Sequence, residues 1–239
     1  MKRQTYLFLI VFVGIIVLVF RNWFIHPEII GGDWPYYYED FLTSFSLHPI
    51  LWQPWLGNGL GSVQPLLGLH FFGSAIIVFF TQWLHIAWNI AYKIGWFGLF
   101  LMLSFFSPIV LWHSIFPRVS SWWPGLLAGL IYSTNTYILM VTGGGQMGVA
   151  LAYSVAPLVL ASFIKNSSIA GLILGLQLMI DPRIAYVTMI GVGIYSMSNV
   201  KCQMSNAIRI LVVPLVIAIG INAFWVIPMV VMKSNPLES

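Results

Sequence analysis

The sequence predicts an all-α integral membrane protein, and composition and apolar runs support that fold class. Of its 239 residues, 59% are hydrophobic and only 7% are charged, whereas about a quarter of the residues in a soluble domain are charged. Apolar runs recur that approach the roughly 20 residues a helix needs to cross a bilayer. We expect about seven transmembrane helices in a single polytopic domain, residues 1–239, without a soluble domain. The formal charge of +4 fits basic loops between membrane helices and does not require nucleic acid as a partner.

The first helix is predicted to be an uncleaved signal anchor. Lys2 and Arg3 precede an apolar run that extends to Phe20, as in a secretory signal peptide. No small-residue cleavage site follows the run, and Arg21, Asn22 and Trp23 form a basic and aromatic border instead. The two basic residues at the start place the N-terminus in the cytoplasm and the next loop outside.

Residues 22–65 are predicted to form the first extracytoplasmic loop. The segment contains four of the six acidic residues and neither lysine nor arginine. Its five prolines break it too often for a long helix, so we expect short interfacial helices joined by turns. The acidic residues are Glu28, Asp33, Glu39 and Asp40.

Asp33 is the main candidate for a catalytic residue in this loop. Gly31 and Gly32 permit a positive φ or a close backbone approach, and Pro35 restricts the residue before it. The turn should therefore present the carboxylate to a site at the membrane surface. Aromatic rings near Asp33 in the sequence either stack on a sugar or belong to an interfacial aromatic belt, which needs no ligand. These rings are Trp34, Tyr36, Trp52 and Trp55.

A family resemblance rests on the Gly-Asp pair at 32–33 and on Trp52-Gln53-Pro54-Trp55-Leu56-Gly57-Asn58-Gly59-Leu60-Gly61 before Pro65. Together with the preceding membrane helix, these features resemble the first outer loop of GT-C type glycosyltransferases, which take sugars from polyprenyl-phosphate donors. The resemblance implies that Asp33 is the catalytic base or a carboxylate bound to Mg or Mn, with Glu39 and Asp40 as secondary candidates. It also implies further helices, so that this chain resembles an N-terminal fragment of such an enzyme.

Residues 66–85 are predicted to form an interfacial or re-entrant amphipathic helix. The run 66–84 is uncharged and long enough to span a bilayer, but its polar members fall on one helical stripe: His70, Ser74, Thr81 and His85. If this helix does not span, Arg118, Lys165, Lys201 and Arg209 are all cytoplasmic, as the positive-inside rule favours.

The remaining helices are predicted from the apolar runs at Ile94–Trp112, Trp122–Val141, Met147–Ile164, 168–180, 183–198 and 210–232. Ser133, Thr134, Asn135 and Thr136 interrupt the second of these runs, and we expect them to bond neighbouring helices. Gly143, Gly144 and Gly145 form an outer turn that matches G-x-G-x-x-G without the strand context of a nucleotide site. A tight turn is the simpler interpretation, and phosphate binding by glycine amides is the alternative.

Asp181-Pro182-Arg183 joins two short apolar helices. Ionisable groups at membrane depth are costly and tend to be paired or functional. The sequence leaves open a local Asp181–Arg183 contact in a hairpin turn and a site in which Arg183 meets a lipid phosphate, with Asp181 as a further acidic candidate.

The sequence thus favours a glycosyltransferase of the cell membrane and envelope that acts at the extracytoplasmic face. Its expected partners are a polyprenyl-phosphate-linked sugar, a glycan or lipid acceptor and membrane lipid. The alternative is a multi-pass protein without catalysis, such as a transporter, lipid-carrier module or scaffold subunit. Transporters usually carry midplane charge in broken helices and paired repeats, which this sequence does not show clearly.

Overall fold

The computed structural model describes residues 2–26, 52–53, 62–63, 76–119, 121–165, 169–198 and 204–231. This part of the chain is helical apart from one two-residue antiparallel pair, β1 (Trp52–Gln53) with β2 (Ser62–Val63). The predicted all-α class is therefore confirmed. The helices, of which η1 and η2 are π-helices, are α1 Lys2–Val19, α2 Arg21–Ile25, η1 Phe79–Trp83, α5 Trp88–Tyr92, η2 Lys93–Gly98, α6 Leu99–Ile115, α7 Trp123–Thr134, α8 Thr136–Gly143, α9 Met147–Ile164, α10 Ala170–Ile180, α11 Pro182–Ser198, α12 Met204–Ile221 and α13 Ala223–Val231.

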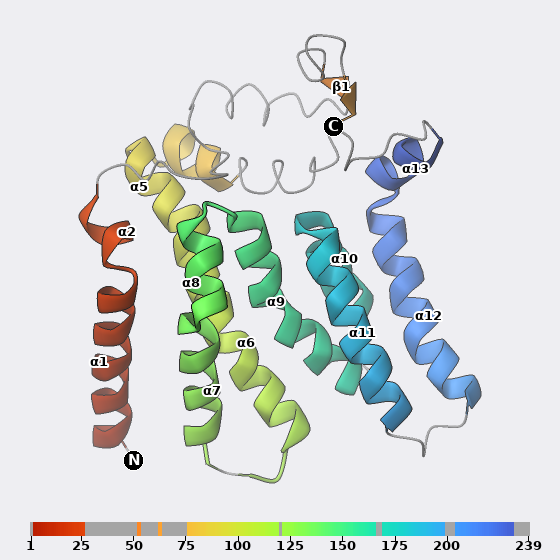
Figure 1. Cartoon of the computed structure of the whole chain (residues 1–239), viewed down its shortest axis with the longest axis horizontal. Helices are drawn as coiled ribbons and strands as arrows, with labels where there is room; N and C mark the ends of the chain where they lie inside the picture. Colours follow the sequence, from red (N-terminus) through yellow and green to blue (C-terminus); the bar gives the residue numbers. More distant parts are fainter. Residues whose placement is uncertain are drawn as a thin grey trace.

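The long helices run alternately up and down in a bundle (Figure 1). We call the end that carries α2 and α5 the upper end, and the end that carries the N-terminus the lower end. The turn between α8 and α9 and the turn between α10 and α11 both lie at the upper end (Figure 1). The connection between α6 and α7, which contains Arg118, lies at the lower end, as does Lys165 after α9. These relative positions agree with the predicted alternation of turns.

Three stretches are long and apolar enough to cross a membrane: Trp88–Ile115, Trp123–Gly143 and Met147–Ile164. Shorter apolar helices occur at Ile10–Val19, Ala170–Ile180 and Leu211–Ile221. These lengths refer to the described part of the chain. Many large apolar side chains on the outside of the bundle are exposed, among them Met102, Leu127 and Ile194. An apolar outer surface together with apolar helices indicates a multi-pass protein whose solvent is lipid.

Helices α6 and α9 form the centre of the bundle, and glycines bring neighbours close to them. A β-carbon on Gly129 of α7 would lie 2.5 Å from the carbonyl oxygen of Phe105 in α6, so only glycine permits this approach. A glycine also permits the close contact of α10 with α12, because a β-carbon on Gly171 would lie 2.8 Å from the carbonyl oxygen of Pro214. Small residues at helix contacts are typical of membrane bundles, where close packing drives association.

The N-terminal helix is fixed to the bundle by aromatic rings. Trp23 of α2 is only 6% exposed and stacks on Phe97, with ring centroids 4.6 Å apart and planes 7° apart. Phe20 makes an edge contact with Phe97 at 5.2 Å. Trp23, which was expected in the aromatic border after the first apolar run, thus packs α2 against η2 through its indole ring.

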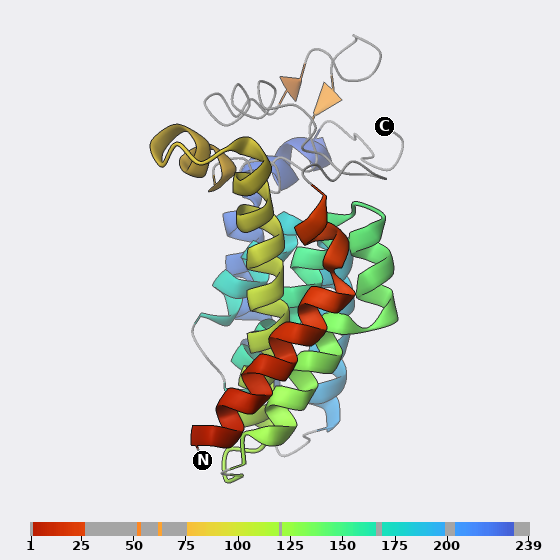
Figure 2. The same cartoon turned by 90° about the vertical axis from the view of Figure 1, so that its left-hand side faces the viewer.

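The helix predicted from Ile94 begins earlier, at Trp88, and therefore includes Lys93. The Lys93 amine donates a hydrogen bond to the carbonyl oxygen of His26, which gives this charge a partner at the upper end. Residues 76–78 are helical and continue into η1, and this segment lies across the upper end of the bundle (Figure 2). Ile76 and Ile77 pack on Gly95. Of the predicted helix 66–85, residues 66–75 lie outside the described part.

The helix predicted over Trp122–Val141 is broken at Asn135, between α7 and α8. Asn135 has an extended backbone, and its Oδ1 accepts a hydrogen bond from the amide of Ile138 in α8. Its Nδ2 donates to the carbonyl oxygen of Tyr132 at 2.8 Å. Asparagine competes with helical hydrogen bonds in this way, so the polar group expected to bond neighbouring helices also ends one helix and caps the next.

Candidate functional site

Most of the residues predicted for the first loop lie outside the described part of the chain. These are Asp33, Glu39, Asp40, Trp34, Tyr36 and Trp55, and for Trp52 only the backbone is described, in β1. Their catalytic, metal-binding and sugar-stacking roles stay predictions. The described residues that flank the loop, His26 and Ile76, follow α2 and precede η1 at the upper end (Figure 1).

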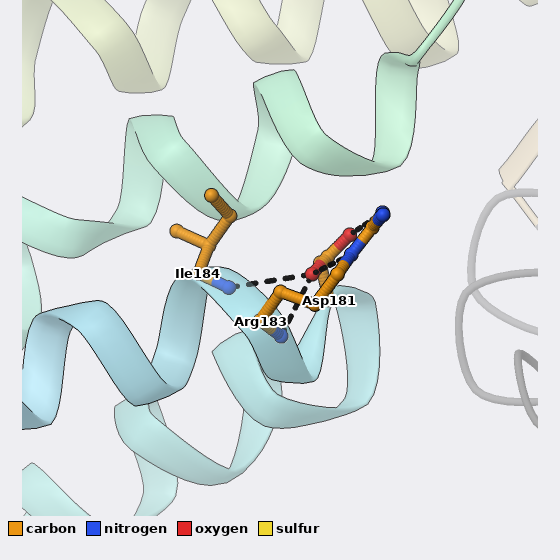
Figure 3. Close-up of polar contacts among 3 residues, drawn as sticks. All are labelled: Asp181, Arg183 and Ile184. Carbon is orange, nitrogen blue, oxygen red and sulfur yellow. Dashed lines mark hydrogen bonds and ion pairs between the residues drawn. The ribbon is translucent and has the colours of Figure 1, made fainter. Parts of the chain in front are cut away.

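Asp181 lies between α10 and α11 and caps the second of them. Its Oδ1 accepts hydrogen bonds from the backbone amides of Arg183 at 2.9 Å and Ile184 at 3.3 Å (Figure 3). Pro182 occupies the first helical position, where the absence of an N–H is harmless. An aspartate that accepts from the amides of the first turn is a favourable N-cap. The residue is only 3% exposed, so its buried carboxylate has a structural role as the cap of α11.

The same carboxylate also holds the Arg183 side chain. Arg183 Nε donates to Oδ1 at 3.2 Å, and Nη2 donates to Oδ2 at 2.7 Å (Figure 3). Of the two interpretations that the sequence left open, the local contact of this acid and base is present in the structure. Arg183 nevertheless remains 69% exposed in its side chain, and its Nη1 has no partner among the described residues. Because Asp181 binds the guanidinium along one edge, the other N–H groups point in a fixed direction. This arrangement is suited to binding a phosphate.

Packing places this turn beside the start of α9. Ile180 precedes Asp181 and Ile184 follows Arg183, and both pack against the core cluster that contains Met147 and Ala150. Figure 3 shows Ile184 directed towards α9. Only Gln146, the N-cap of α9, separates the Gly143–Gly145 turn from Met147. The structure therefore brings two of the predicted elements, the Asp181–Arg183 turn and the glycine turn, to the same end of the bundle.

The glycine turn itself is a tight helix connection, as predicted. Gly145 is buried and has φ of 75°, a backbone conformation that favours glycine. The amide of Gly144 donates to Met140 and that of Gly145 to Thr142, so these amides complete the end of α8. The phosphate role of the glycines stays a prediction, and in this conformation these two amides are already used.

A tyrosine cluster that the sequence analysis did not select lies below the glycine turn. The rings of Tyr132 and Tyr153 stack with centroids 4.1 Å apart and planes 9° apart, and Tyr137 approaches Tyr153 at 5.7 Å. Asn135 Nδ2 donates to the Tyr153 hydroxyl at 3.0 Å, and the Tyr132 hydroxyl donates to the Tyr153 carbonyl oxygen at 2.7 Å. The polar run around Asn135 was the available signal, but nothing in it indicated the rings of the neighbouring helix.

An apolar cavity of about 300 Å³ lies among η2, α6, α9 and α10. Its lining includes Trp96, Leu99, Leu151, Val155, Leu176 and Ile180. Ile180 directly precedes Asp181, so the lining reaches the residue next to the capped turn. Arg183, Asp181 and the three glycines are not part of the lining, so the structure does not unite them with this cavity.

No group of three or more histidine, cysteine, aspartate or glutamate side chains that could hold a metal ion occurs in the part of the chain that the structure describes. Asp181 is the only acidic residue in that part, and its oxygens are occupied by the cap and by Arg183. The Mg or Mn site expected at Asp33 lies outside the described residues and stays a prediction. Comparisons of the chain with protein-family models, curated proteins and solved structures gave no match.

Proposed function

We propose that the chain is a membrane glycosyltransferase, or its N-terminal part, that transfers a sugar from a polyprenyl-phosphate donor at the extracytoplasmic face. The observation that carries the proposal is the exposed guanidinium of Arg183, held by a buried carboxylate at the upper end of an apolar bundle. The loop that contains Asp33 is flanked by residues at the same end. In this proposal the fixed cation of Arg183 and the carboxylates of that loop supply the groups that phosphosugar transfer needs.

In this proposal the upper end is extracytoplasmic and the N-terminus is cytoplasmic. About seven helical segments cross the membrane, and the helix over 66–85 lies in the interface. Support comes from Arg118 and Lys165, which lie at the same end as the N-terminus, since cytoplasmic loops favour basic residues. The buried carboxylate of Asp181 keeps Arg183 paired at the opposite end.

The reaction is a displacement at the anomeric carbon of the donor sugar. The bond from this carbon to the phosphate oxygen breaks, and polyprenyl phosphate leaves with the electron pair. The acceptor hydroxyl oxygen forms the new glycosidic bond, and its proton passes to the carboxylate of Asp33. The sugar acquires oxocarbenium character in the transition state, which a carboxylate stabilises. Arg183 compensates the negative charge on the leaving phosphate.

The cavity among α6, α9 and α10 provides apolar space for part of the isoprenoid chain. Its lining is formed by side chains such as Leu151, Val155 and Leu176, which match an isoprenoid in polarity. Ile180, which contributes to the lining of the cavity, directly precedes the Asp181–Arg183 turn in the chain. A lipid donor needs both an apolar chain site and a charged head site, and in this proposal the cavity and Arg183 are the candidates for the two.

The test is the substitution Asp33→Asn, assayed for transfer of a labelled sugar from a polyprenyl-phosphate donor in membranes. We expect transfer to be lost while the protein is expressed and inserted as the wild type. Glu28→Gln, in the same loop, is the matched control and should retain transfer. Unchanged transfer by Asp33→Asn would contradict the assignment, and absence of transfer by the wild type would favour the scaffold alternative.

A further inference from the structure

Lys93 is the only lysine, arginine, aspartate or glutamate in the apolar stretch Trp88–Ile115. It begins η2, next to α5 at the upper end of the bundle (Figure 1). Arg118 and Lys165 lie at the opposite end, so the rule that collects basic residues on one side of a membrane does not account for Lys93. Ionisable groups in such stretches are costly and tend to be paired or functional, and this lysine therefore needs its own explanation.

The amine of Lys93 has a neutral acceptor but no counter-ion in the described part of the chain. It donates a hydrogen bond to the carbonyl oxygen of His26, which uses one of the three N–H groups of an ammonium. Asp181 is the only acidic residue in that part, and its carboxylate is already paired with Arg183. None of the described residues therefore compensates the positive charge of Lys93.

Exposed apolar side chains surround this amine on both elements that it joins. Ile90 and Ile94, three residues before Lys93 and one after it, are 49% and 46% exposed. Phe24 and Ile25, which directly precede His26, are 51% and 70% exposed. Exposed side chains of this kind on a membrane bundle face lipid, so the amine lies at the edge of a lipid-facing surface.

The contact of α2 with η2 keeps the His26 carbonyl beside Lys93 without help from the lysine. Trp23 stacks on Phe97 of η2 with ring centroids 4.6 Å apart. Phe24 makes an edge contact with the same ring at 5.7 Å. Aromatic contacts of this kind are favourable beyond the area they bury. Substitution of Lys93 should therefore leave α2 attached to η2.

We propose that Lys93 binds the phosphate group of an anionic membrane phospholipid beside the contact of α2 with η2. A phosphate oxygen accepts from the N–H groups that the His26 carbonyl leaves over and compensates the charge. The acyl chains lie along exposed apolar side chains such as Ile90 and Ile94. These neighbours favour a phosphate presented by a lipid over a free phosphate. The proposal does not rest on the proposed function, because it concerns a different cation from Arg183.

The test measures binding of dioleoyl phosphatidylglycerol to the purified full chain in detergent by native mass spectrometry. We expect Lys93→Gln to weaken binding of the tightest lipid about fivefold to tenfold, since one charged hydrogen-bond donor is lost. Lys93→Arg retains the charge and should bind as the wild type. Lys165→Gln is the matched control, because it removes the same charge from the opposite end, and it should also bind as the wild type.

Two outcomes with these variants would overturn the site. Unchanged binding by Lys93→Gln would exclude Lys93 as the partner of the phosphate. Equal weakening by Lys93→Gln and Lys165→Gln would show a general attraction between a basic protein and an anionic lipid, without a specific site.

Two further ligands test recognition on the wild type alone. Dioleoylglycerol has the same acyl chains without the phosphate and should bind more weakly than phosphatidylglycerol. Inorganic phosphate should compete poorly with the lipid. Equal binding of the two lipids would overturn phosphate recognition, and efficient displacement by inorganic phosphate would overturn recognition of a lipid.

Glu28, two residues after His26 in the chain, is the alternative counter-ion. In our proposal phosphatidylglycerol raises the midpoint of thermal unfolding of the wild type and of Glu28→Gln, and raises that of Lys93→Gln less. If Glu28→Gln and Lys93→Gln lower the midpoint equally and the lipid has no effect on the wild type, Lys93 is paired within the chain and the lipid site is wrong.

Farnesyl phosphate, a short analogue of the polyprenyl donor, separates this site from that of Arg183. In a binding assay with the purified chain, Lys93→Gln should bind farnesyl phosphate as the wild type does, whereas Arg183→Gln should bind it more weakly. If Lys93→Gln loses farnesyl phosphate and phosphatidylglycerol to the same extent, Lys93 belongs to the donor site and its assignment to a phospholipid is wrong. If the wild type shows no sugar transfer and Lys93→Gln still loses phosphatidylglycerol, the phospholipid site stands and the transferase proposal is wrong.

Discussion

The buried carboxylate of Asp181 fixes the exposed guanidinium of Arg183 two residues further along the chain, through Nε at 3.2 Å and Nη2 at 2.7 Å. The same carboxylate accepts two backbone amides at the start of α11. One side chain thus begins a helix and orients a cation at its end. The two contributions are separable by substitution, because the cap needs only an acceptor oxygen and the ion pair needs a charge.

Asp181→Ala removes the cap and the ion pair, and we expect it to lower the free energy of unfolding by about 0.5–2 kcal/mol. Asp181→Asn retains a good cap but loses the charge, so its stability should stay closer to that of the wild type. Both variants should bind farnesyl phosphate more weakly, since Arg183 is no longer held along one edge. Thermal unfolding in detergent and the binding assay measure the two effects. Equal stability of wild type and Asp181→Ala would contradict the capping role.

Gly171→Ala is expected to destabilise the contact of α10 with α12. The added β-carbon would lie 2.7 Å from Cβ of Ile217 and 2.8 Å from the Pro214 carbonyl oxygen, so the backbones must separate. Overpacking of this kind costs about 1–3 kcal/mol. Gly193→Ala in α11 is the matched control, because nothing lies within 4 Å of its added β-carbon. The midpoint of thermal unfolding should fall for Gly171→Ala only. The same midpoint in both variants would show that α10 and α12 can separate without loss of stability.

The proposed orientation predicts which positions a membrane-impermeant maleimide reaches in intact cells. In a chain with Cys202→Ser as background, single cysteines at Gly144 and Tyr186 should be labelled from outside, since these residues lie at or near the upper end. Cysteines at Arg118 and Lys165 should be labelled only after the membrane is permeabilised. The reverse pattern would place the N-terminus outside and would remove the extracytoplasmic site.

Leu176→Trp tests the cavity as the site of the isoprenoid chain. Leu176 contributes to the lining and is 43% exposed, so a larger ring can occupy the cavity without displacing a fully buried side chain. Affinity for farnesyl phosphate should fall, whereas affinity for isopentenyl phosphate, with its short chain, should change little. Leu172→Trp, one turn earlier and outside the lining, should leave both affinities as in the wild type. Identical farnesyl phosphate binding by both tryptophan variants would exclude the cavity.

Local signals in the sequence were sufficient for the helices that begin or end at glycine, proline or aspartate. Helix α9 has the predicted bounds Met147–Ile164, because the glycine turn marks its start. Helices α10 and α11 meet at Asp181 and Pro182 as predicted, since an aspartate followed by proline is a strong helix start. The local contact of Asp181 with Arg183 was one of two interpretations that the sequence allowed, and their spacing alone did not decide between them.

Features that depend on distant partners were not predictable in the same way. Trp23 stacks on Phe97, which is more than 70 residues away in the chain, whereas the sequence around Trp23 indicated only a basic and aromatic border. The apolar run predicts a helix from Ile94 that excludes Lys93, because a lysine usually ends such a run, yet the Lys93 amine has an acceptor in the His26 carbonyl oxygen. The contact of Tyr137 with Tyr153 was equally unpredictable, because Tyr153 belongs to α9.

The break at Asn135 has a consequence for how the chain enters the membrane. The stretch Trp123–Gly143 has a mean hydropathy of 1.2, against 2.0 for both Trp88–Ile115 and Met147–Ile164, so it is the weakest of the three candidates for insertion. The acceptor for the Tyr132 hydroxyl is a carbonyl oxygen of α9, and the Tyr153 hydroxyl that Asn135 contacts also belongs to α9. The polar groups of the weak segment are therefore fully satisfied only when α9 has followed it. We therefore expect the α7–α9 hairpin, rather than the stretch Trp123–Gly143 alone, to be the unit that is stable in lipid.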